Sequence, residues 1–182
     1  MNEIELKFKL NSRKELNELE KKLKDLKAKK IGSFSESNHL FDSENKAVSK
    51  SDCVVRLRKM NKEIYLCFKG PLKSSIFKER TEIEFKVNSF VKLKKELNEM
   101  GLKEKFIYQK KKKVFKLKNA VLDLAELPVI GFWIEIEGEK KSITLIAEKL
   151  GFKMKDSIVK SFPKLFFEKA KRKKLKKKNM VF

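Results

Sequence analysis

Charged side chains recur at every second position along several stretches of the sequence. The first stretch, MNEIELKFKL, places Glu3, Glu5 and Lys7 at this spacing, with Ile4 and Leu6 between them. In a β-strand, residues at this spacing project from one face at steps of about 6.5 to 7 Å. Further charges follow at Arg56/Arg58, Lys69, Arg80/Glu82/Glu84, Lys110–Lys113, Asp123 and Glu135/Glu137.

The two signs of charge are sorted by strand. The acids gather in the first and last stretches, and the bases gather in the middle ones. A hard divalent cation prefers carboxylate oxygens, whereas a polyphosphate prefers guanidinium and ammonium donors. A site for a metal–triphosphate complex needs both kinds together. The sequence has no glycine-rich phosphate loop, so side chains must bind the phosphates.

Two architectures could position these side chains. One is a flat antiparallel sheet with one wet face. The other is a closed barrel with a polar interior, whose apolar exterior is covered by amphipathic helices; about eight strands leave room for one small ligand. The sorting of acids and bases favours the barrel. We therefore predict an α+β fold, a closed eight-stranded antiparallel β-barrel (tunnel) with amphipathic helices packed outside.

The elements follow from periodicity and breaker residues. A helix is expected after Ser12, its N-cap, because leucines recur at helical spacing from Leu16 to Leu26 and Glu15 completes a capping box. Further helices are expected at 90–100, capped by Ser89, and from Ser142 to Gly151. Segment 31–42 is expected to be extended or irregular. Strands are expected at 3–10, 53–59, 63–69, 78–87, 103–117, 120–124 and 132–138.

The composition limits the partners and the compartment. The 182 residues carry 47 Lys+Arg against 25 Asp+Glu, a net charge of +22, which indicates an anionic partner or simply a lysine-rich surface. The two cysteines lack metal-ligand spacing, and we expect free thiols in a reducing compartment. No apolar run reaches membrane-spanning length, and the start lacks a signal-peptide core. We expect a cytoplasmic protein with no membrane partner, and a dimer is one oligomeric state left open.

The ordered set of charged motifs resembles the CYTH superfamily of triphosphate tunnel metalloenzymes, which includes class IV adenylate cyclases and thiamine and inorganic triphosphatases. The match begins with the ExExK signature at Glu3–Lys7 and covers about residues 1–163. The resemblance implies a cofactor, Mg²⁺ or Mn²⁺, with candidate metal ligands Glu3, Glu5, Glu82, Glu84, Glu135 and Glu137. It implies catalytic roles for Glu3, Glu5, Lys7 and Asp123. It implies triphosphate binding by Lys7, Arg56, Arg58, Lys69, Arg80, Lys110, Lys112 and Lys160.

The sequence departs from the family pattern in three places. The basic strand holds lysine throughout 110–113, where family members commonly have an arginine, so the bidentate grip is lost. Lys160-Ser161-Phe162 replaces a Ser-Tyr pair, although Lys160 could still reach a phosphate. The basic segment 164–182, separated here from a tunnel domain at 1–163, has no counterpart; it could be a frayed helix, a polyanion-binding arm or, as we favour, a solvated lysine-rich end.

Two reactions fit this chemistry, and other classes of function remain open. Water attacking the terminal phosphorus gives a triphosphatase, and a ribose 3′-hydroxyl attacking the α-phosphorus of ATP gives cyclic AMP and pyrophosphate. The alternatives are a non-catalytic polyanion or nucleic-acid binder that uses the basic surface and the 164–182 tail, which is disfavoured, and an inactive scaffold. His39 is expected to be a surface residue, and Phe132 and Trp133 are expected on the barrel exterior beneath a helix.

Overall fold

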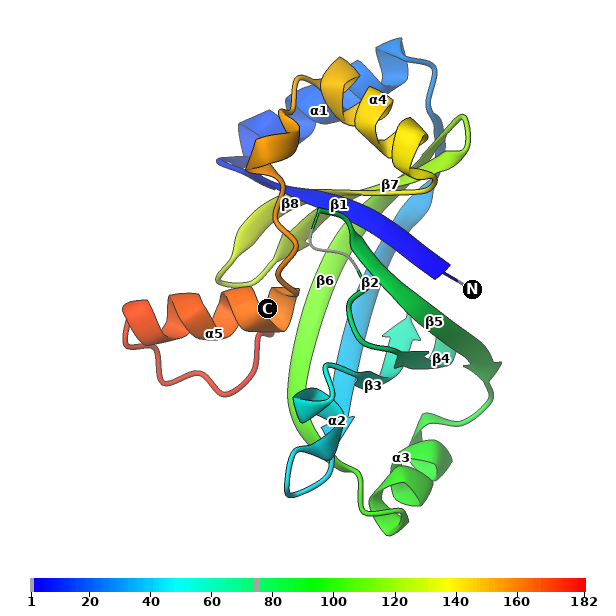
Figure 1. Cartoon of the computed structure of the whole chain (residues 1–182), viewed down its shortest axis with the longest axis vertical. Helices are drawn as coiled ribbons and strands as arrows, with labels where there is room; N and C mark the ends of the chain where they lie inside the picture. Colours follow the sequence, from blue (N-terminus) through cyan, green and yellow to red (C-terminus); the bar gives the residue numbers. More distant parts are fainter. Residues whose placement is uncertain (1, 74–75) are drawn as a thin grey trace.

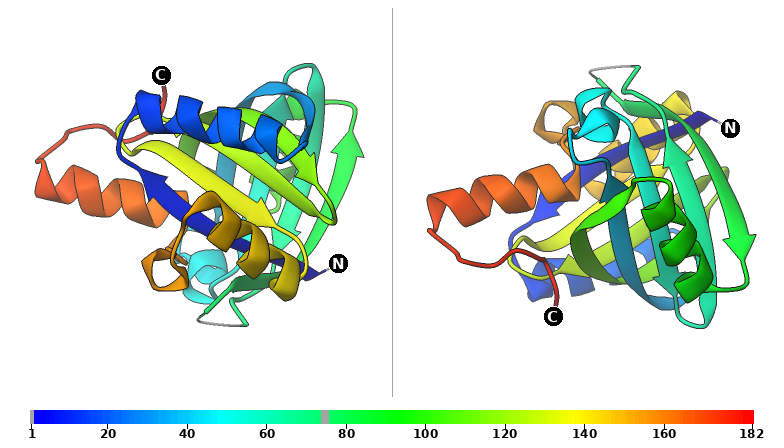
Figure 2. Two further views of the ribbon diagram at one scale, coloured as in Figure 1. Left: turned by 90° about the horizontal axis from the view of Figure 1, so that it is seen from above. Right: turned by 90° about the horizontal axis from the view of Figure 1, so that it is seen from below.

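The computed structural model describes residues 2–73 and 76–182. Within them, eight antiparallel strands form a closed barrel in the order β1-β5-β4-β3-β2-β6-β7-β8 (Figures 1 and 2). The predicted fold class is therefore confirmed. The strands are β1 (Asn2–Leu10), β2 (Lys29–Asp42), β3 (Val54–Met60), β4 (Glu63–Lys69), β5 (Lys78–Val87), β6 (Lys103–Leu117), β7 (Ala120–Leu127) and β8 (Gly131–Glu137).

The main core lies outside the barrel, between β1, β7 and β8 and two helices, α1 (Arg13–Asp25) and α4 (Lys140–Leu150). Leu6 and Phe8 of β1 and Ile134 and Ile136 of β8 are almost fully buried there, against leucines of α1 and isoleucines of α4. Because strand side chains alternate between faces, the charged residues between these apolar ones point into the barrel.

The ends of these helices follow local capping chemistry. The Ser12 hydroxyl accepts a hydrogen bond from the Glu15 backbone N–H at 3.2 Å, as predicted. The Glu15 carboxylate accepts one from the backbone N–H of Asn11 at 2.6 Å, so the reciprocal bond goes to the residue before the N-cap. Helix α4 begins at Lys140, two residues before the predicted start, and Gly151 ends it with a φ of 93°.

Two further helices cover the opposite part of the barrel. Helix α3 (Phe90–Glu99) is capped by Ser89 as predicted, and its Leu97 packs on Val55 and Leu57 of β3. Helix α2 (Ala47–Lys50) lies in the connection from β2 to β3. A short 3₁₀ helix, Met154–Asp156, follows α4.

The segment predicted to be extended or irregular is the regular strand β2. It pairs with β3 and, over most of its length, with β6, so that Asn38 lies opposite both Arg58 and Tyr108. It bulges between Leu40 and Phe41. Strand β2 supplies the eighth strand that the tunnel needs.

The basic C-terminal segment is tied to the barrel by α5 (Phe162–Arg172), which extends sideways from it (Figure 1). Phe162, Phe166 and Ala170 of α5 are buried in a cluster with Phe106 and Trp133. Further on, Met180 exchanges backbone hydrogen bonds with Ile107 and Gln109. The favoured expectation of a solvated end is wrong for α5 and for Met180, but the lysines from 171 to 178 are exposed.

The two aromatic residues at the start of β8 lie on different faces. Phe132 packs against the outer core, as expected. Trp133 shares the inward face with Glu135 and lies opposite Lys9, under Phe162 of α5, so the expectation of an exterior position is wrong for it.

In the described ranges, no helix combines the length and the apolar character that crossing a membrane requires.

Candidate functional site

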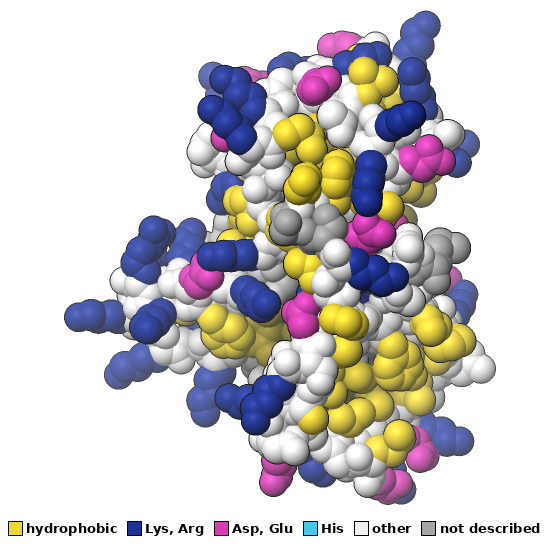
Figure 3. Space-filling model, viewed as in Figure 1, with side chains coloured by type: hydrophobic (Ala, Val, Ile, Leu, Met, Phe, Trp, Pro, Cys, Tyr) yellow, Lys and Arg dark blue, Asp and Glu magenta, His cyan; other side chains and the backbone are white. Residues whose placement is uncertain are grey.

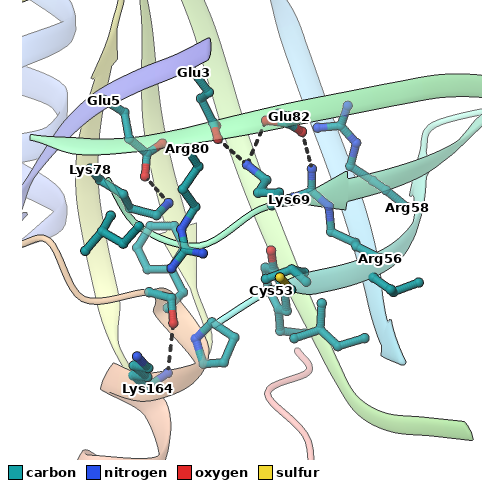
Figure 4. A pocket seen from close by; sticks show the side chains of 18 of the residues that line it. Glu3, Glu5, Cys53, Arg56, Arg58, Lys69, Lys78, Arg80, Glu82 and Lys164 are labelled. Carbon is teal, nitrogen blue, oxygen red and sulfur yellow. Dashed lines mark hydrogen bonds and ion pairs between the residues drawn. The ribbon is translucent and has the colours of Figure 1, made fainter. Parts of the chain in front are cut away.

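The interior of the barrel holds a cavity of about 1350 Å³ that opens beside α5. This is above the roughly 300 to 1,000 Å³ of common small-molecule sites. Figure 4 shows part of its wall, with acids and bases from β1, β3, β4 and β5 pointing toward one another. The structure places every candidate residue named from the sequence along this one cavity: Glu3, Glu5, Lys7, Arg56, Arg58, Lys69, Arg80, Glu82, Glu84, Lys110, Lys112, Asp123, Glu135, Glu137 and Lys160.

Three carboxylates meet where β1 closes the barrel against β8. Glu5 lies directly opposite Glu137 in the register, and Glu3 is the next inward residue of β1. Partial burial, together with the charges of Glu3 and Glu5, raises the pKa of Glu137 to about 7. Burial and the charge of Glu5 also raise the pKa of Glu3. Glu3 and Glu137 therefore hold their protons more tightly than exposed carboxyl groups do.

Lys69 and Lys78 are the cations beside this acidic cluster. The Lys69 ammonium lies 2.5 Å from Glu3 Oε2 and 2.8 Å from Glu82 Oε2 (Figure 4). Lys78 donates to the buried carboxylate of Glu5. Burial alone would raise the pKa of Glu5, but Lys78 and Lys7 hold it well below its usual range.

Lys78 is a site residue that the sequence analysis missed. It begins β5 two positions before Arg80 and so continues the alternation of Arg80, Glu82 and Glu84. The spacing was therefore a usable signal. Burial alone would lower the pKa of Lys78, but Glu5 and Glu3 raise it, so it stays charged.

The arginines of β3 are paired with the acids of β5. Arg58 Nη2 lies 2.5 Å from Glu84 Oε1, and Arg56 Nη2 lies 3.4 Å from Glu82 Oε1. Burial would raise the pKa of Glu82, but Lys69 and hydrogen bonds to the carboxylate hold it at about 2. Glu82 and Glu84 therefore act as counter-ions to the arginines in this state.

The basic strand β6 is balanced in the same way. The ammonium of Lys110 lies 2.8 Å from Glu135 Oε2 and 3.2 Å from Asp123 Oδ2, and that of Lys112 lies 2.8 Å from Asp123 Oδ2. Burial would lower the pKa of Lys110, but these acids and Glu36 raise it well above its usual value. Asp123 thus orients two candidate phosphate-binding lysines.

Glu36 of β2 is the second site residue that the sequence analysis missed. Its side chain is almost completely buried, 2.9 Å from the ammonium of Lys112 and 3.7 Å from Arg58 Nη1. Burial would raise its pKa, but Lys110, Lys112 and Arg58 lower it strongly. A segment expected to be irregular offered no signal for it.

Arg80 is engaged by backbone and by Asp52. Its Nη1 donates to the carbonyl oxygens of Asp52 and Gly70, and its Nη2 donates to both carboxylate oxygens of Asp52 at 3.0 and 3.1 Å. Arg80 therefore fastens the loops after α2 and β4 to the barrel. At the opening, Lys160 pairs with Glu168 of α5 at 2.7 Å.

Glu3, Glu5 and Glu137 carry the carboxylate oxygens that Mg²⁺ and Mn²⁺ prefer, although these oxygens do not all lie within 4.8 Å of one another. Burial, together with neighbouring acids, raises the pKa of Glu3 and of Glu137, and a bound cation would oppose this effect. Among the described residues, the group whose ligand atoms all lie within 4.8 Å of one another is Cys67, Glu82 and Glu84. Its acids pair with Arg56 and Arg58, as Glu3 and Glu5 pair with Lys69 and Lys78. A cation at either place would have to displace these bases.

His39 does not line the cavity. Its ring contacts Glu104 at 2.7 Å, Ser37 at 3.0 Å and the ring of Phe90 outside the barrel. It is half-buried and takes no part in the site.

Comparison with known proteins follows this geometry. The family model described as the CYTH domain matches residues 1–162, which contain the whole barrel and end at the first residue of α5. The chain belongs to the CYTH family.

Two relatives of this CYTH chain are similar to it over most of its length. A Methanocaldococcus jannaschii protein provisionally named an adenylate cyclase is 27% identical over 149 residues, which is 82% of each chain. The solved structure of a Pyrococcus horikoshii protein is 26% identical, with a TM-score of 0.78, over 90% of this chain and 98% of that one.

A more distant structure, from Hippeastrum, shares the fold at 17% identity with a TM-score of 0.66, over 91% of this chain and 95% of that one. That protein is described as a provisionally assigned adenylyl cyclase with a dominant triphosphatase activity. At this identity the likeness concerns the fold of the CYTH chain alone.

Proposed function

We propose that this CYTH protein is a divalent-metal-dependent enzyme that cleaves a phosphoanhydride bond in a triphosphate-containing substrate, and hydrolysis is the first candidate reaction. The observation that carries the proposal is the crowded cluster of Glu3, Glu5 and Glu137 facing a wall of buried bases across one cavity. A polyanion binder has no need of carboxylates in its groove, because they repel phosphates. An enzyme that holds a metal and a triphosphate together needs both.

The proposed metal ligands are Glu3, Glu5 and Glu137. Bound there, Mg²⁺ or Mn²⁺ would polarise phosphoryl oxygens and neutralise charge as it develops. Glu135 lies on the same strand, but Lys110 already compensates it. We therefore assign Glu135 to the positioning of that lysine.

The triphosphate is proposed to bind by ion-pair exchange. Arg56, Arg58, Lys69, Lys110 and Lys112 already face the cavity, each held by a carboxylate at hydrogen-bonding or ion-pair distance. Before the substrate binds, the carboxylates would keep the bases oriented toward the cavity. When the triphosphate binds, its oxygens would replace some of these carboxylates beside the bases. Such preorganised cations stabilise charge in the transition state without rearrangement.

Cyclisation of ATP is the second candidate reaction, because the Methanocaldococcus jannaschii relative carries that provisional name. This reaction would use the same metal ligands and the same phosphate-binding bases, but the α-phosphorus rather than the terminal phosphorus would lie at the reacting position. We also propose a cytoplasmic location, since Cys53 and Cys67 are free thiols, as a reducing compartment would keep them.

Product analysis separates these reactions. The protein is incubated with ATP, tripolyphosphate and thiamine triphosphate in turn, with Mg²⁺ or Mn²⁺. Orthophosphate release supports the hydrolase, and cyclic AMP with pyrophosphate supports the cyclase. A Glu137→Gln variant should lose at least 100-fold in rate. Two results together would instead support the polyanion binder. The wild type would turn over none of the substrates, and the variant would bind phosphate as strongly as the wild type or more strongly.

A further inference from the structure

A serine, a histidine and a glutamate are hydrogen-bonded in series on the outside of the barrel. The hydroxyl oxygen of Ser37 lies 3.0 Å from His39 Nε2, and His39 Nδ1 lies 2.7 Å from Glu104 Oε2. We call these three residues the outer triad. Ser37 and His39 belong to β2, and Glu104 belongs to β6. Because Glu36 of β2 lines the tunnel, the alternate residues Ser37 and His39 face outward, away from the candidate metal and phosphate site.

The contacts of the imidazole define the direction of its hydrogen bonds. An ionised carboxylate only accepts hydrogen bonds, so the contact with Glu104 assigns the imidazole proton to Nδ1. His39 Nε2 is then an acceptor, and the Ser37 hydroxyl donates to it. Burial lowers the pKa of His39, so the ring is neutral at neutral pH. A serine that donates to a neutral histidine, itself oriented by an acid, is the combination that activates a serine as a nucleophile.

Helix α3 holds the histidine and the glutamate in place. The ring of Phe90, at the start of α3, packs edge-on against the imidazole of His39, with 4.7 Å between the ring centres. Lys94 of α3 donates to Glu104 Oε2 at 3.0 Å. Burial would raise the pKa of Glu104, but hydrogen bonds with His39 and Lys94 lower it, so the carboxylate is ionised. Figure 2 shows this helix lying against the outside of the barrel.

Two hydrogen-bond donors flank the serine on the neighbouring strands. Ser37 lies directly opposite Lys59 of β3 on one side and Gln109 of β6 on the other. Side chains in such positions begin about 4.5 to 5.5 Å apart, so both can reach an atom bonded to Ser37. The Gln109 Oε1 accepts a hydrogen bond from the Phe182 backbone N–H at 2.9 Å, and the other end of this amide carries two hydrogens. An ammonium and an amide beside a nucleophile can stabilise the negative oxygen that forms when it attacks a carbonyl.

The surroundings of Ser37 indicate the class of substrate. Ser37 is only partly buried, on an open sheet face that suits a small acyl group. The ring of Phe182 lies 4.2 Å from the Lys111 ammonium and keeps half of its surface accessible. Lys111 lies opposite Ser35, two residues from Ser37 on the same face of β2, so this ring offers an apolar contact beside the serine. A carboxylic ester with a small acyl group and an apolar alcohol fits these features.

We propose that the outer triad is a second catalytic site, which hydrolyses small carboxylic esters. The Ser37 oxygen attacks the carbonyl carbon while its proton passes to His39 Nε2. The bond from that carbon to the alcohol oxygen then breaks, and the alcohol leaves with the proton. Water attacks the acyl-serine as His39 takes a proton from it, the acid is released, and His39 returns the proton to Ser37. Glu104 is a positioning residue, because it touches His39 rather than the substrate.

The test is covalent labelling with an uncharged fluorophosphonate, in which the serine oxygen bonds to phosphorus and fluoride leaves. The probe is uncharged because exposed Lys and Arg side chains are spread over the surface and would attract an anion in many places (Figure 3). We expect mass spectrometry to locate the label on Ser37. Ser37→Ala should abolish both this labelling and the hydrolysis of p-nitrophenyl acetate at the site. His39→Gln should slow labelling about 100-fold or more, as loss of a general base does.

The matched control is Ser35→Ala, which removes a hydroxyl from the same outward face of β2. It should leave the labelling rate unchanged. The charged groups that face His39 are Glu104 of β6, Lys94 of α3 and Lys59 of β3. Labelling should rise with pH as His39 loses its proton. Glu104→Gln should slow labelling and move the midpoint of this profile to lower pH, because the carboxylate raises the pKa of His39; a merely structural role would leave the midpoint in place.

Several outcomes would overturn the proposal. They are a wild-type protein that takes up no label, labelling that persists in Ser37→Ala, an equal loss in Ser35→Ala, and an unchanged midpoint in Glu104→Gln. Labelling of Ser37 should also continue in EDTA and in saturating tripolyphosphate, and inhibition by either would place the reaction in the tunnel instead. The inference does not depend on the proposed function: a protein that is labelled as described but cleaves no triphosphate would support the outer triad and refute only the tunnel reaction.

Discussion

The ammonium of Lys69 lies 2.5 Å from a carboxylate oxygen of Glu3, so a candidate phosphate-binding group and a candidate metal ligand hold each other. Both side chains are mostly buried, which makes the pair strong and directional. A metal–triphosphate complex would take both partners at once, the cation replacing Lys69 beside Glu3 and a phosphate oxygen replacing Glu3 beside Lys69. The ion pair thus keeps both groups in place for the complex.

Lys69→Gln should raise the KM for tripolyphosphate about 10- to 100-fold, because it removes one charge-assisted hydrogen bond to a phosphate. Initial-rate kinetics at saturating Mg²⁺ measure it. Lys86→Gln is the control, since Lys86 pairs with Glu63 in an exposed position. A KM equal to that of the wild type would remove Lys69 from the binding site.

Ionisation of Glu137 should lower the stability of the metal-free protein as pH rises from about 4.5 to about 7, whereas His39, whose pKa is lowered by burial, contributes in the opposite direction in wild type and variant alike. The pKa of Glu137 is raised in the fold, so the native state holds this proton more tightly than the unfolded chain, and the stabilisation is lost as Glu137 ionises. Thermal melting in EDTA across this range measures the effect. Glu137→Gln should flatten the profile, and Mg²⁺ should raise the wild-type Tm at pH 8 more than at pH 5. A wild-type Tm that rises steadily from pH 5 to 8 in EDTA, unchanged in the variant, would contradict this account.

Glu36→Gln should destabilise the protein by about 1 to 3 kcal/mol at pH 7, because Lys112 and Arg58 lose a buried counter-ion and keep only Asp123 and Glu84. Denaturant unfolding measures the change, with Glu63→Gln as the exposed control. Tripolyphosphate should reduce the difference between variant and wild type, since it supplies the missing negative charge. A loss no larger than that of the control would show that Glu36 has no such role.

Arg80→Lys tests whether Arg80 fastens loops or binds substrate. An ammonium cannot reproduce the paired contacts to Asp52 together with two carbonyl oxygens, so we expect a loss of about 1 to 3 kcal/mol in stability with less than a threefold change in KM. Arg13→Lys, at an exposed pair with Glu126, is the control. An unchanged Tm with a large rise in KM would return Arg80 to the phosphate-binding set.

The sequence predicted the barrel because charged and apolar residues alternate along β1 and in parts of β3, β5 and β8. It did not predict β2 as a regular strand, for a physical reason. Glu36 and Asn38 face the tunnel, while Ser35, Ser37 and His39 on the other face are also polar, so no alternation marks the strand. Its pairing with β3 and β6 sets its structure.

The position of α5 was hidden for a related reason. Its apolar face is narrow, with Phe162, Phe166 and Ala170 at four-residue spacing among many lysines. The composition therefore indicated a solvated segment. The helix packs at the barrel opening because Phe106 and Trp133 of the barrel offer an apolar surface that α5 covers. The sequence suggested that acids and bases lie on different strands, which is only partly true. Glu82 of β5 pairs with Arg56, and Glu36 of β2 pairs with Lys112, so acids also lie among the basic strands.

Strand β1 hydrogen-bonds both to β5 and to β8, so it is the strand that completes the cylinder. During synthesis on the ribosome it emerges before the other strands of the barrel, and its neighbour β8 is made more than 120 residues later. Glu5 and Glu137 can therefore meet only in a chain whose last strand has already left the exit tunnel. A nascent chain truncated before β8 would hold most of the basic residues without this acidic cluster, and it would bind anions well before it could bind a metal.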